Sequence, residues 1–104
     1  MGALEDKKAE DIVLIDLQGV VIFTDYFVIC SGTSDRMIRS LVRAANDAML
    51  ESHGMKGKIY GSASNGWIAV DFGDIVLHVF SPQQRDYYQL EELWSSGKTL
   101  LRVK

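Results

Sequence analysis

With 104 residues, the chain fits one ordinary domain and can bury roughly 60–70% of its unfolded surface without disulfides or metal. Its formal charge of −3 argues against nucleic acid as the main ligand, because phosphate binding depends on clustered Lys and Arg, and favours a basic protein partner. No apolar run approaches the ~20 residues needed to cross a bilayer, which argues against a membrane protein.

The compartment expected from the sequence is the cytoplasm. Cys30, the single cysteine, lies in an apolar run and excludes a disulfide within the chain. The first eleven residues, MGALEDKKAED, are charged and lack the apolar core of a signal peptide. Asp6 also stands where a myristoylation signal requires Ser or Thr.

The first predicted elements are a short helix over Leu4–Glu10 and two strands over Ile12–Leu17 and Tyr26–Cys30. Both strand segments are apolar almost throughout, which is typical of central strands buried on both faces. Gln18-Gly19 ends the first strand, and Asp25 is expected to cap or close the connection through its side chain.

A long helix is predicted from Ser34, a good N-cap, to His53, with Gly54 as a left-handed C-cap. Its apolar positions recur as one buried stripe. The opposite side carries Arg36, Arg39 and Arg43 at steps of three and four residues. This basic side is interpreted either as an ordinary solvated face or as a weak contact for phosphate or RNA.

Gly57–Gly61 is a short strand candidate, and Ser62–Gly66 is a polar loop that leads to a hairpin. The two hairpin strands are Trp67–Phe72 and Ile75–Phe80, joined by the two-residue turn Gly73-Asp74. A helix follows, with Ser81 as N-cap, Pro82 in the first turn and Gln84 completing a capping box. It is expected to continue to about Trp94, with its apolar residues on the sheet and its Tyr hydroxyls in water. The tail, Lys98–Lys104, is left open between an edge strand and a loose end.

The alternation of side chains in the hairpin gives its two faces different characters. One face pairs Phe72 with Ile75, Val70 with Leu77 and Ile68 with Val79, and is apolar. The other face pairs Asp71 with Val76, Ala69 with His78 and Trp67 with Phe80. A covering helix would explain this second face as ordinary core, whereas aromatics beside polar groups are also typical of a protein-docking surface.

These elements predict an α/β (α+β) domain with a mixed five-stranded sheet flanked by helices. No active site is evident. Ser31–Ser34 could cradle a phosphate before the long helix, but it lacks the P-loop Lys and any Gly-x-Gly-x-x-Gly pattern. Asp16 and Asp71 are isolated, and Cys30, His53 and His78 are too scattered for a zinc site, so we expect no metal and no cofactor.

Four blocks then reveal a resemblance, and they follow one another in register from Leu4 to Trp94: AEDIVLIDLQG, FTDYFVICSGTSDR, GWIAVDFGDIVLHVF and RDYYQLEELW. They resemble the ribosomal silencing factor, or Iojap-like, family. The tail 98–104 lies outside these blocks. The resemblance implies a fold like that of nucleotidyltransferases without their catalytic carboxylates.

The resemblance also implies a non-enzymatic factor that binds the large ribosomal subunit through large-subunit protein fourteen. Occupying that surface would block the small subunit and lower translation when nutrients are short; organellar members act in subunit assembly. Family members are often homodimers. Trp67 is the contact that the resemblance carries over first. Asp71, His78 and Phe80 match the family pattern VDxGDxxxHxF, and the face assignment adds them and Val76 as contacts.

Two other hypotheses stay open from the sequence. A degenerate nucleotide-binding protein would use Ser31–Ser34 as its phosphate cradle. A simple interaction module would dimerise through the aromatic face.

Overall fold

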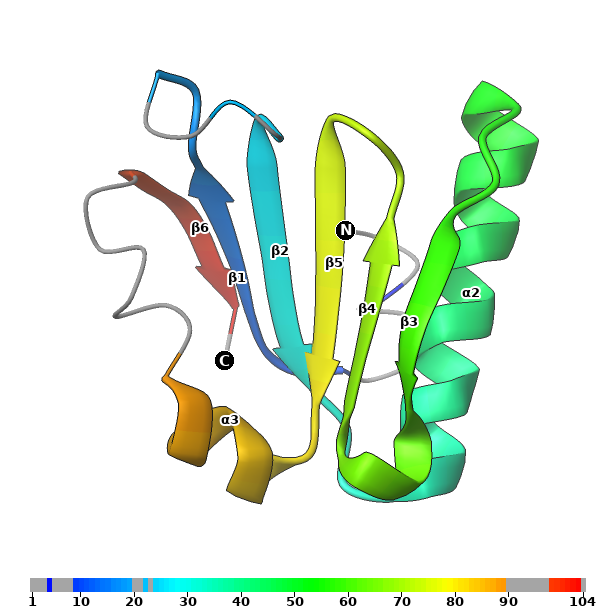
Figure 1. Cartoon of the computed structure of the whole chain (residues 1–104), viewed down its shortest axis with the longest axis vertical. Helices are drawn as coiled ribbons and strands as arrows, with labels where there is room; N and C mark the ends of the chain where they lie inside the picture. The colour runs from blue at the N-terminus through cyan, green and yellow to red at the C-terminus, as the bar shows by residue number, and fades with distance from the viewer. Residues whose placement is uncertain (1–3, 5–8, 20–21, 23, 90–97, 104) are drawn as a thin grey trace.

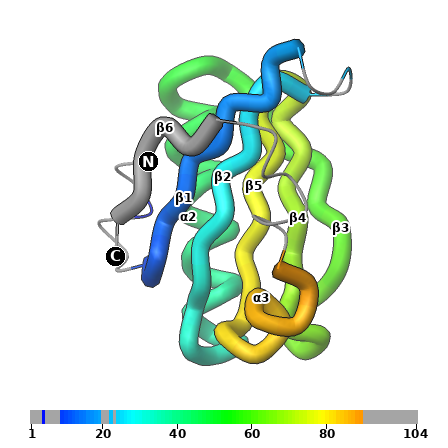
Figure 2. Tube along the Cα trace, turned by 90° about the vertical axis from the view of Figure 1, so that its left-hand side faces the viewer, coloured from blue at the N-terminus to red at the C-terminus, as the bar shows by residue number. Residues whose placement is uncertain are grey.

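The computed structural model describes Leu4 and residues 9–19, 22, 24–89 and 98–103, the last of these by their backbone. These residues form a mixed six-stranded sheet with the strand order β3-β4-β5-β2-β1-β6. The helices α2 and α3 lie on opposite sides of the sheet (Figures 1 and 2). The predicted α/β class is confirmed, with one strand more than expected.

The two apolar runs at the start form central strands, as predicted. Strand β1 is Glu10–Asp16 and β2 is Tyr26–Ser31, and the two pair antiparallel. Asp25 closes the connection through its backbone rather than its side chain, because the Leu17 N–H donates to the Asp25 carbonyl and the Asp25 N–H donates to the Asp74 carbonyl. The Thr24 hydroxyl adds a hydrogen bond to the Asp74 carbonyl at 2.9 Å. The helix expected over residues 4–10 falls mostly outside the described residues, and Glu10 begins β1.

Helix α2, Asp35–His53, begins and ends where its caps predict. The Ser34 hydroxyl accepts a hydrogen bond from the Met37 N–H, and Gly54 adopts the left-handed conformation at φ 64°. Its buried residues are Ile38, Leu41, Val42 and Ala45, and they pack on the face of the sheet that carries Ile68, Val70 and Val79. Burial of this stripe stabilises the first face of the sheet.

The hairpin is confirmed pair by pair. Strand β4, Trp67–Asp71, pairs antiparallel with β5, Ile75–Phe80, in the predicted register of Trp67 with Phe80, Ala69 with His78 and Asp71 with Val76. Gly73-Asp74 forms the turn, and the Phe72 N–H donates to the Ile75 carbonyl at 2.9 Å. Strand β5 also pairs in parallel with β2, which places the hairpin beside the centre of the sheet.

The second face of the sheet has a core of its own. Its buried members come from β1, β2 and β5 and from Leu17: Val13, Ile15, Leu17, Phe27, Ile29 and Phe80. Trp67 and Val76 pack against this cluster and stay partly buried. The interpretation of this face as ordinary core is therefore correct for the centre of the sheet.

The two edges complete the architecture. Strand β3, Lys58–Ser62, pairs with β4 and leads through the short 3-10 helix η1, Ala63–Asn65, into the hairpin. At the other edge the tail forms β6, Lys98–Val103, antiparallel to β1. Of the two alternatives for the tail, an edge strand or a loose end, the structure has the edge strand.

Helix α3 spans Pro82–Tyr88 and is shorter than expected. The Ser81 hydroxyl accepts from the Gln84 N–H, as a capping box requires. In a full capping box the Gln84 side chain would in turn accept from the Ser81 N–H. Here the Ser81 N–H donates instead to the Gly66 carbonyl at 2.8 Å. The remaining residues of the predicted helix, 90–94, lie outside the described part of the chain.

Gly61 is the glycine that the fold requires most. Its φ is +86°, and an added Cβ would lie 2.3 Å from the Trp67 carbonyl oxygen. Gly73 has a similar φ of +92° with nothing within 4 Å of an added Cβ. Gly73→Ala should therefore lower the free energy of unfolding by about 1–2 kcal/mol from backbone strain alone. Gly61→Ala should lower it by a further ~1–3 kcal/mol, because backbone must move.

Urea unfolding of both variants checks this expectation. Equal losses of stability for the two substitutions would contradict the close approach between Gly61 and the Trp67 carbonyl.

Candidate functional site

Trp67 opens β4 at the end of the sheet where η1 and α3 also lie (Figure 1). Gly66 precedes it with φ +77°, and an added Cβ there would come within 2.7 Å of Gln84 and Ser81. Glycine therefore allows the start of β4 to pass close to the start of α3. The hydrogen bond from the Ser81 N–H to the Gly66 carbonyl ties the two together.

The Trp67 side chain rests on rings from β5 and α3. Its ring centroid lies 4.9 Å from that of Phe80 and 4.7 Å from that of Tyr88. Its indole N–H donates to Nδ1 of His78 at 3.2 Å. These contacts hold the indole in one orientation while leaving part of it exposed.

His78 is a buried neutral imidazole. Burial lowers the pKa of His78 from 6.5 to about 4. Because Nδ1 accepts from Trp67, the proton of the neutral ring sits on Nε2. The ring also packs edge-on against Phe27, with centroids 4.6 Å apart. His78 thus orients Trp67 from below the surface.

A groove of about 360 Å³ opens beside the exposed edge of Trp67. Its lining comes from β3, η1, β4 and α3: Tyr60, Gly61, Asn65, Trp67, Ala69 and Tyr88. Tyr60 is 56% exposed and Tyr88 is 41% exposed, so two phenol rings flank the indole. We call this set of six residues the aromatic groove. It is the open part of the second face, toward the β3 edge.

The structure separates the five predicted contact residues. Trp67 lines the groove, but Phe80 is fully buried and His78 is 7% exposed, so neither offers a surface to a partner. Val76 packs against the second core cluster. Asp71 accepts a hydrogen bond from the Gly73 N–H at 2.8 Å and supports the turn. Phe80 and His78 are thus covered by the centre of the second face in this structure, and a contact of the five residues with a partner stays a prediction.

Tyr60 and Tyr88 were missed as groove residues. Tyr60 lies in the weakest predicted strand, and only its register opposite Ala69 places it on the second face. Tyr88 belongs to the block RDYYQLEELW but was assigned to packing. One signal in the sequence could have identified them. Both are tyrosines, which can remain exposed and are common in protein interfaces.

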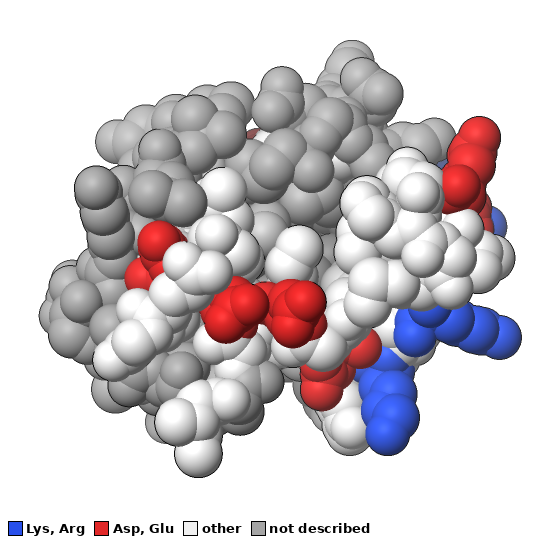
Figure 3. All heavy atoms as spheres, turned by 90° about the horizontal axis from the view of Figure 1, so that it is seen from above, with Lys and Arg blue, Asp and Glu red and all other residues white. Residues whose placement is uncertain are grey.

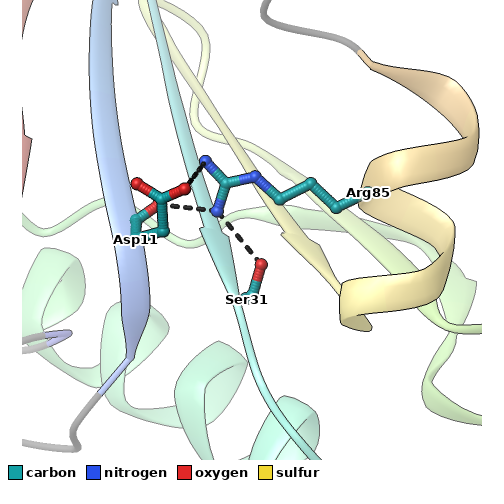
Figure 4. Close-up of polar contacts among 3 residues, drawn as sticks. All are labelled: Asp11, Ser31 and Arg85. Carbon is teal, nitrogen blue, oxygen red and sulfur yellow. Dashed lines mark hydrogen bonds and ion pairs between the residues drawn. The ribbon is translucent and has the colours of Figure 1, made fainter. Parts of the chain in front are cut away.

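A third missed residue is Arg85 of α3, which is 7% exposed. Figure 4 shows its guanidinium reaching β1 and β2. Nη1 donates to the Asp11 carbonyl at 2.6 Å and to the Ser31 hydroxyl at 3.0 Å, and Nη2 lies 3.5 Å from the Asp11 carboxylate. This ion pair, with Arg85 buried and Asp11 partly exposed, fixes α3, and with it Tyr88, against the sheet.

Asp11 meets Arg85 because β1 is irregular there. The pairing of β1 with β2 shifts register between Glu10 and Val13, and Asp11 has a φ of 46°. Asp and Asn tolerate this left-handed conformation better than most residues. The irregularity turns both the carbonyl and the carboxylate of Asp11 to one guanidinium.

The proposed phosphate cradle is occupied by the fold itself. The Ser31 hydroxyl accepts from Arg85, the Gly32 N–H donates to the Phe80 carbonyl, and the Ser34 hydroxyl caps α2. Burial raises the pKa of the neighbouring Cys30 thiol to about 12, against a smaller opposing effect of Arg85. Nothing in this loop favours nucleotide binding or thiol chemistry.

Within the described residues, no three His, Cys, Asp or Glu side chains are grouped as metal ligands. No helix in the same part of the chain is long and apolar enough to cross a membrane. What the described surface does offer is an aromatic groove on an α/β domain, which is typical of a protein-binding domain.

The comparison with known families makes this class specific. The family described as "Ribosomal silencing factor during starvation" matches residues 1–103, and the chain belongs to this family. The recognition based on four blocks is thereby confirmed. The match also includes the tail, which those blocks had left outside.

Individual relatives agree. The chain is 41% identical to the ribosomal silencing factor RsfS of Bacillus subtilis over 96 residues, which cover 92% of this chain and 81% of the relative. It is 38% identical to the mouse protein named "Mitochondrial assembly of ribosomal large subunit protein 1" over 99 residues, which cover 91% of this chain and 43% of the mouse protein. A crystal structure of a Chromobacterium violaceum protein superposes with a TM-score of 0.83 at 34% identity. The superposition covers 90% of this chain and 78% of that protein.

Burial of His78 makes stability depend on pH. A histidine whose folded pKa lies below its unfolded value resists protonation, so the fold is fully stable above pH 6.5 and loses stability as the pH falls from 6.5 to about 4. The expected loss is about 3 kcal/mol. His78→Asn keeps an acceptor for Trp67 and should remove most of this pH dependence in urea titrations.

His53→Asn is the matched control, because His53 is the other histidine and is exposed. Its pH profile should follow the unsubstituted protein. A profile for His78→Asn that stays as steep would contradict the assignment.

The Asp11–Arg85 pair should contribute strongly to stability. Arg85→Gln leaves the Asp11 groups without their buried partner and should lower the free energy of unfolding by about 2–4 kcal/mol. Arg43→Gln on exposed α2 should change it by less than ~0.5 kcal/mol. Chemical denaturation of the two variants tests this, and a near-neutral Arg85→Gln would contradict a structural role for the pair.

Proposed function

We propose that this protein binds large-subunit ribosomal protein fourteen through the aromatic groove and thereby prevents the small subunit from joining. The observation that carries the proposal is the partly open Trp67, packed against Phe80 and Tyr88 and sharing its groove with Tyr60, on a chain of the ribosomal silencing factor family. Exposed aromatic anchors that are already oriented lose little entropy on binding and are typical of interface hot spots.

Charge supports the same partner class. The chain carries −3, whereas proteins that bind ribosomal RNA are commonly basic. Opposite net charges accelerate encounter and help to select the partner.

Silencing by this route requires no catalysis. A body with extents of 35 × 33 × 23 Å on the joining face of the large subunit would keep the small subunit away by sterics alone. The family description links such silencing to starvation, and we propose that translation falls when nutrients are short. We place the protein in the cytoplasm with its ribosomes; the expected homodimer stays a prediction.

A second candidate role is assembly of the large subunit, which the name of the mouse relative suggests. Both roles would use the same docking surface. They differ in outcome, because an assembly factor would cause precursors of the large subunit to accumulate when it is removed.

Co-sedimentation with isolated large and small subunits, with joining scored in the same gradients, tests the docking surface. Tyr60→Ala should weaken binding to the large subunit by on the order of 2 kcal/mol, as expected for a hot spot. Because Tyr60 is 56% exposed, the fold should survive this change. Joining of the subunits should recover in parallel.

Tyr87→Ala is the matched control, since Tyr87 is 78% exposed and lies outside the groove lining. Trp67→Phe provides a second groove variant that keeps a ring against Phe80. Unchanged binding for Tyr60→Ala and Trp67→Phe, or an equal loss for Tyr87→Ala, would overturn the proposed surface. Binding of the unsubstituted protein to neither subunit would overturn the function.

A further inference from the structure

Three arginines form a stripe along the outer side of α2. Arg36, Arg39 and Arg43 are all exposed, and steps of three and four residues place them on one side of the helix over about 10 Å. Asp35 and Asp47 lie four positions from Arg39 and Arg43, yet neither makes an ion pair with them within 4 Å in the described part of the chain. The cations of this arginine stripe thus keep their hydrogen-bond donors available.

Arg36 lies where a cation opposes the stability of α2. Helices are stabilised by anions near the N-terminus and cations near the C-terminus. Arg36 is in the first turn, although Asp35 beside it has the favourable sign. Helix stability alone therefore does not account for Arg36.

The arginine stripe lies at the same end of the molecule as the aromatic groove. The N-terminal half of α2 runs beside η1 (Figures 1 and 2). Ala63 of η1 packs in the core with Ile38 and Leu41 of α2, and Asn65 of η1 lines the groove. The stripe faces away from the sheet, on the side opposite the groove, so a partner seated in the groove brings to it only those surroundings that extend past the η1 end of the domain.

One part of the opposite end of the sheet is acidic. Figure 3, seen from above, shows several carboxylate side chains gathered across this end, with Lys or Arg side chains at one border. Asp16 ends β1, and Asp25 and Asp74 meet through a backbone hydrogen bond at 2.9 Å in the adjoining loops. A polyanion would be repelled from this acidic part and attracted to the stripe.

We infer that Arg36, Arg39 and Arg43 bind the phosphate backbone of ribosomal RNA that passes the η1 end of the domain, on the side of the sheet opposite the docking site. The inference rests on the proposed function, since docking on a ribosomal protein brings RNA within reach. Arginine forks match phosphate geometry bidentately. The stripe carries no aromatic anchor of the kind that the groove supplies, which favours phosphates over an acidic protein surface.

Salt dependence of binding to isolated large subunits tests the inference. Each phosphate contact adds about one to the slope of log affinity against log salt. Arg36→Gln with Arg39→Gln and Arg43→Gln should make that slope shallower by about two to three and weaken binding roughly tenfold at 100 mM salt. The melting temperature should be unchanged or higher, because the substitutions remove a cation that opposes the helix dipole.

Two controls accompany the triple variant. Lysine at the three positions should retain the slope, because it retains the charge. Lys56→Gln with Lys58→Gln removes exposed cations near the opposite end of the molecule and should leave binding unchanged. An unchanged slope and affinity in the triple glutamine variant would overturn the inference.

Two further probes separate this inference from the proposed function. Binding of the triple glutamine variant to isolated large-subunit protein fourteen should equal that of the unsubstituted protein; an equal loss there would show that the stripe contacts protein and would overturn the inference. Gel shifts with protein-free large-subunit RNA at low salt should show weaker binding for the same variant. If the variant binds this RNA more weakly while the unsubstituted protein binds neither ribosomal subunit, the proposed function is overturned and RNA binding by the arginine stripe is supported.

Discussion

Both faces of the six-stranded sheet need a cover, and this requirement determines where the molecule can offer a binding surface. Helix α2 covers one face, and the centre of the other is closed around Phe27, Ile29 and Phe80. Among the described residues, the β3 side of that second face carries an open groove. The aromatic groove is therefore the rim of a core, and the Trp67 indole packs against one buried ring, Phe80, and one exposed ring, Tyr88.

Stability and recognition make opposite demands at both proposed surfaces. Tyr60 and Tyr88 leave apolar area in water, and the arginine stripe places one cation, Arg36, in the first turn of α2. The fold tolerates these costs because its strongest contacts lie elsewhere, in the buried stripe of α2 and in the contacts of Arg85 with Asp11 and Ser31. The ion pair also matters for recognition, since it sets the position of α3 and of Tyr88.

Patterns among sequence neighbours predicted the helices and strands well, whereas contacts between residues far apart in the sequence were not predicted. The alternation around Gly73-Asp74 predicted every pair of the hairpin, and the caps Ser34 and Gly54 predicted both ends of α2, because each depends on neighbours in sequence. The parallel pairing of β2 with β5 joins residues about fifty positions apart, and no local pattern specifies it. Arg85 was missed for a related reason: arginine is ordinarily exposed, and its partner Asp11 lies at the far end of the sequence.

The position of β1 between β2 and β6 has a consequence for synthesis. Strand β6, Lys98–Val103, supplies the outer neighbour of β1, and β5 supplies the parallel neighbour of β2. As the chain grows from its N-terminus, the earliest strands must wait for the latest ones before their ladders are complete. Distant pairings of this kind fold slowly, because the intervening loop must close first. A factor that would silence ribosomes thus acquires its full sheet only after the ribosome making it has added Val103.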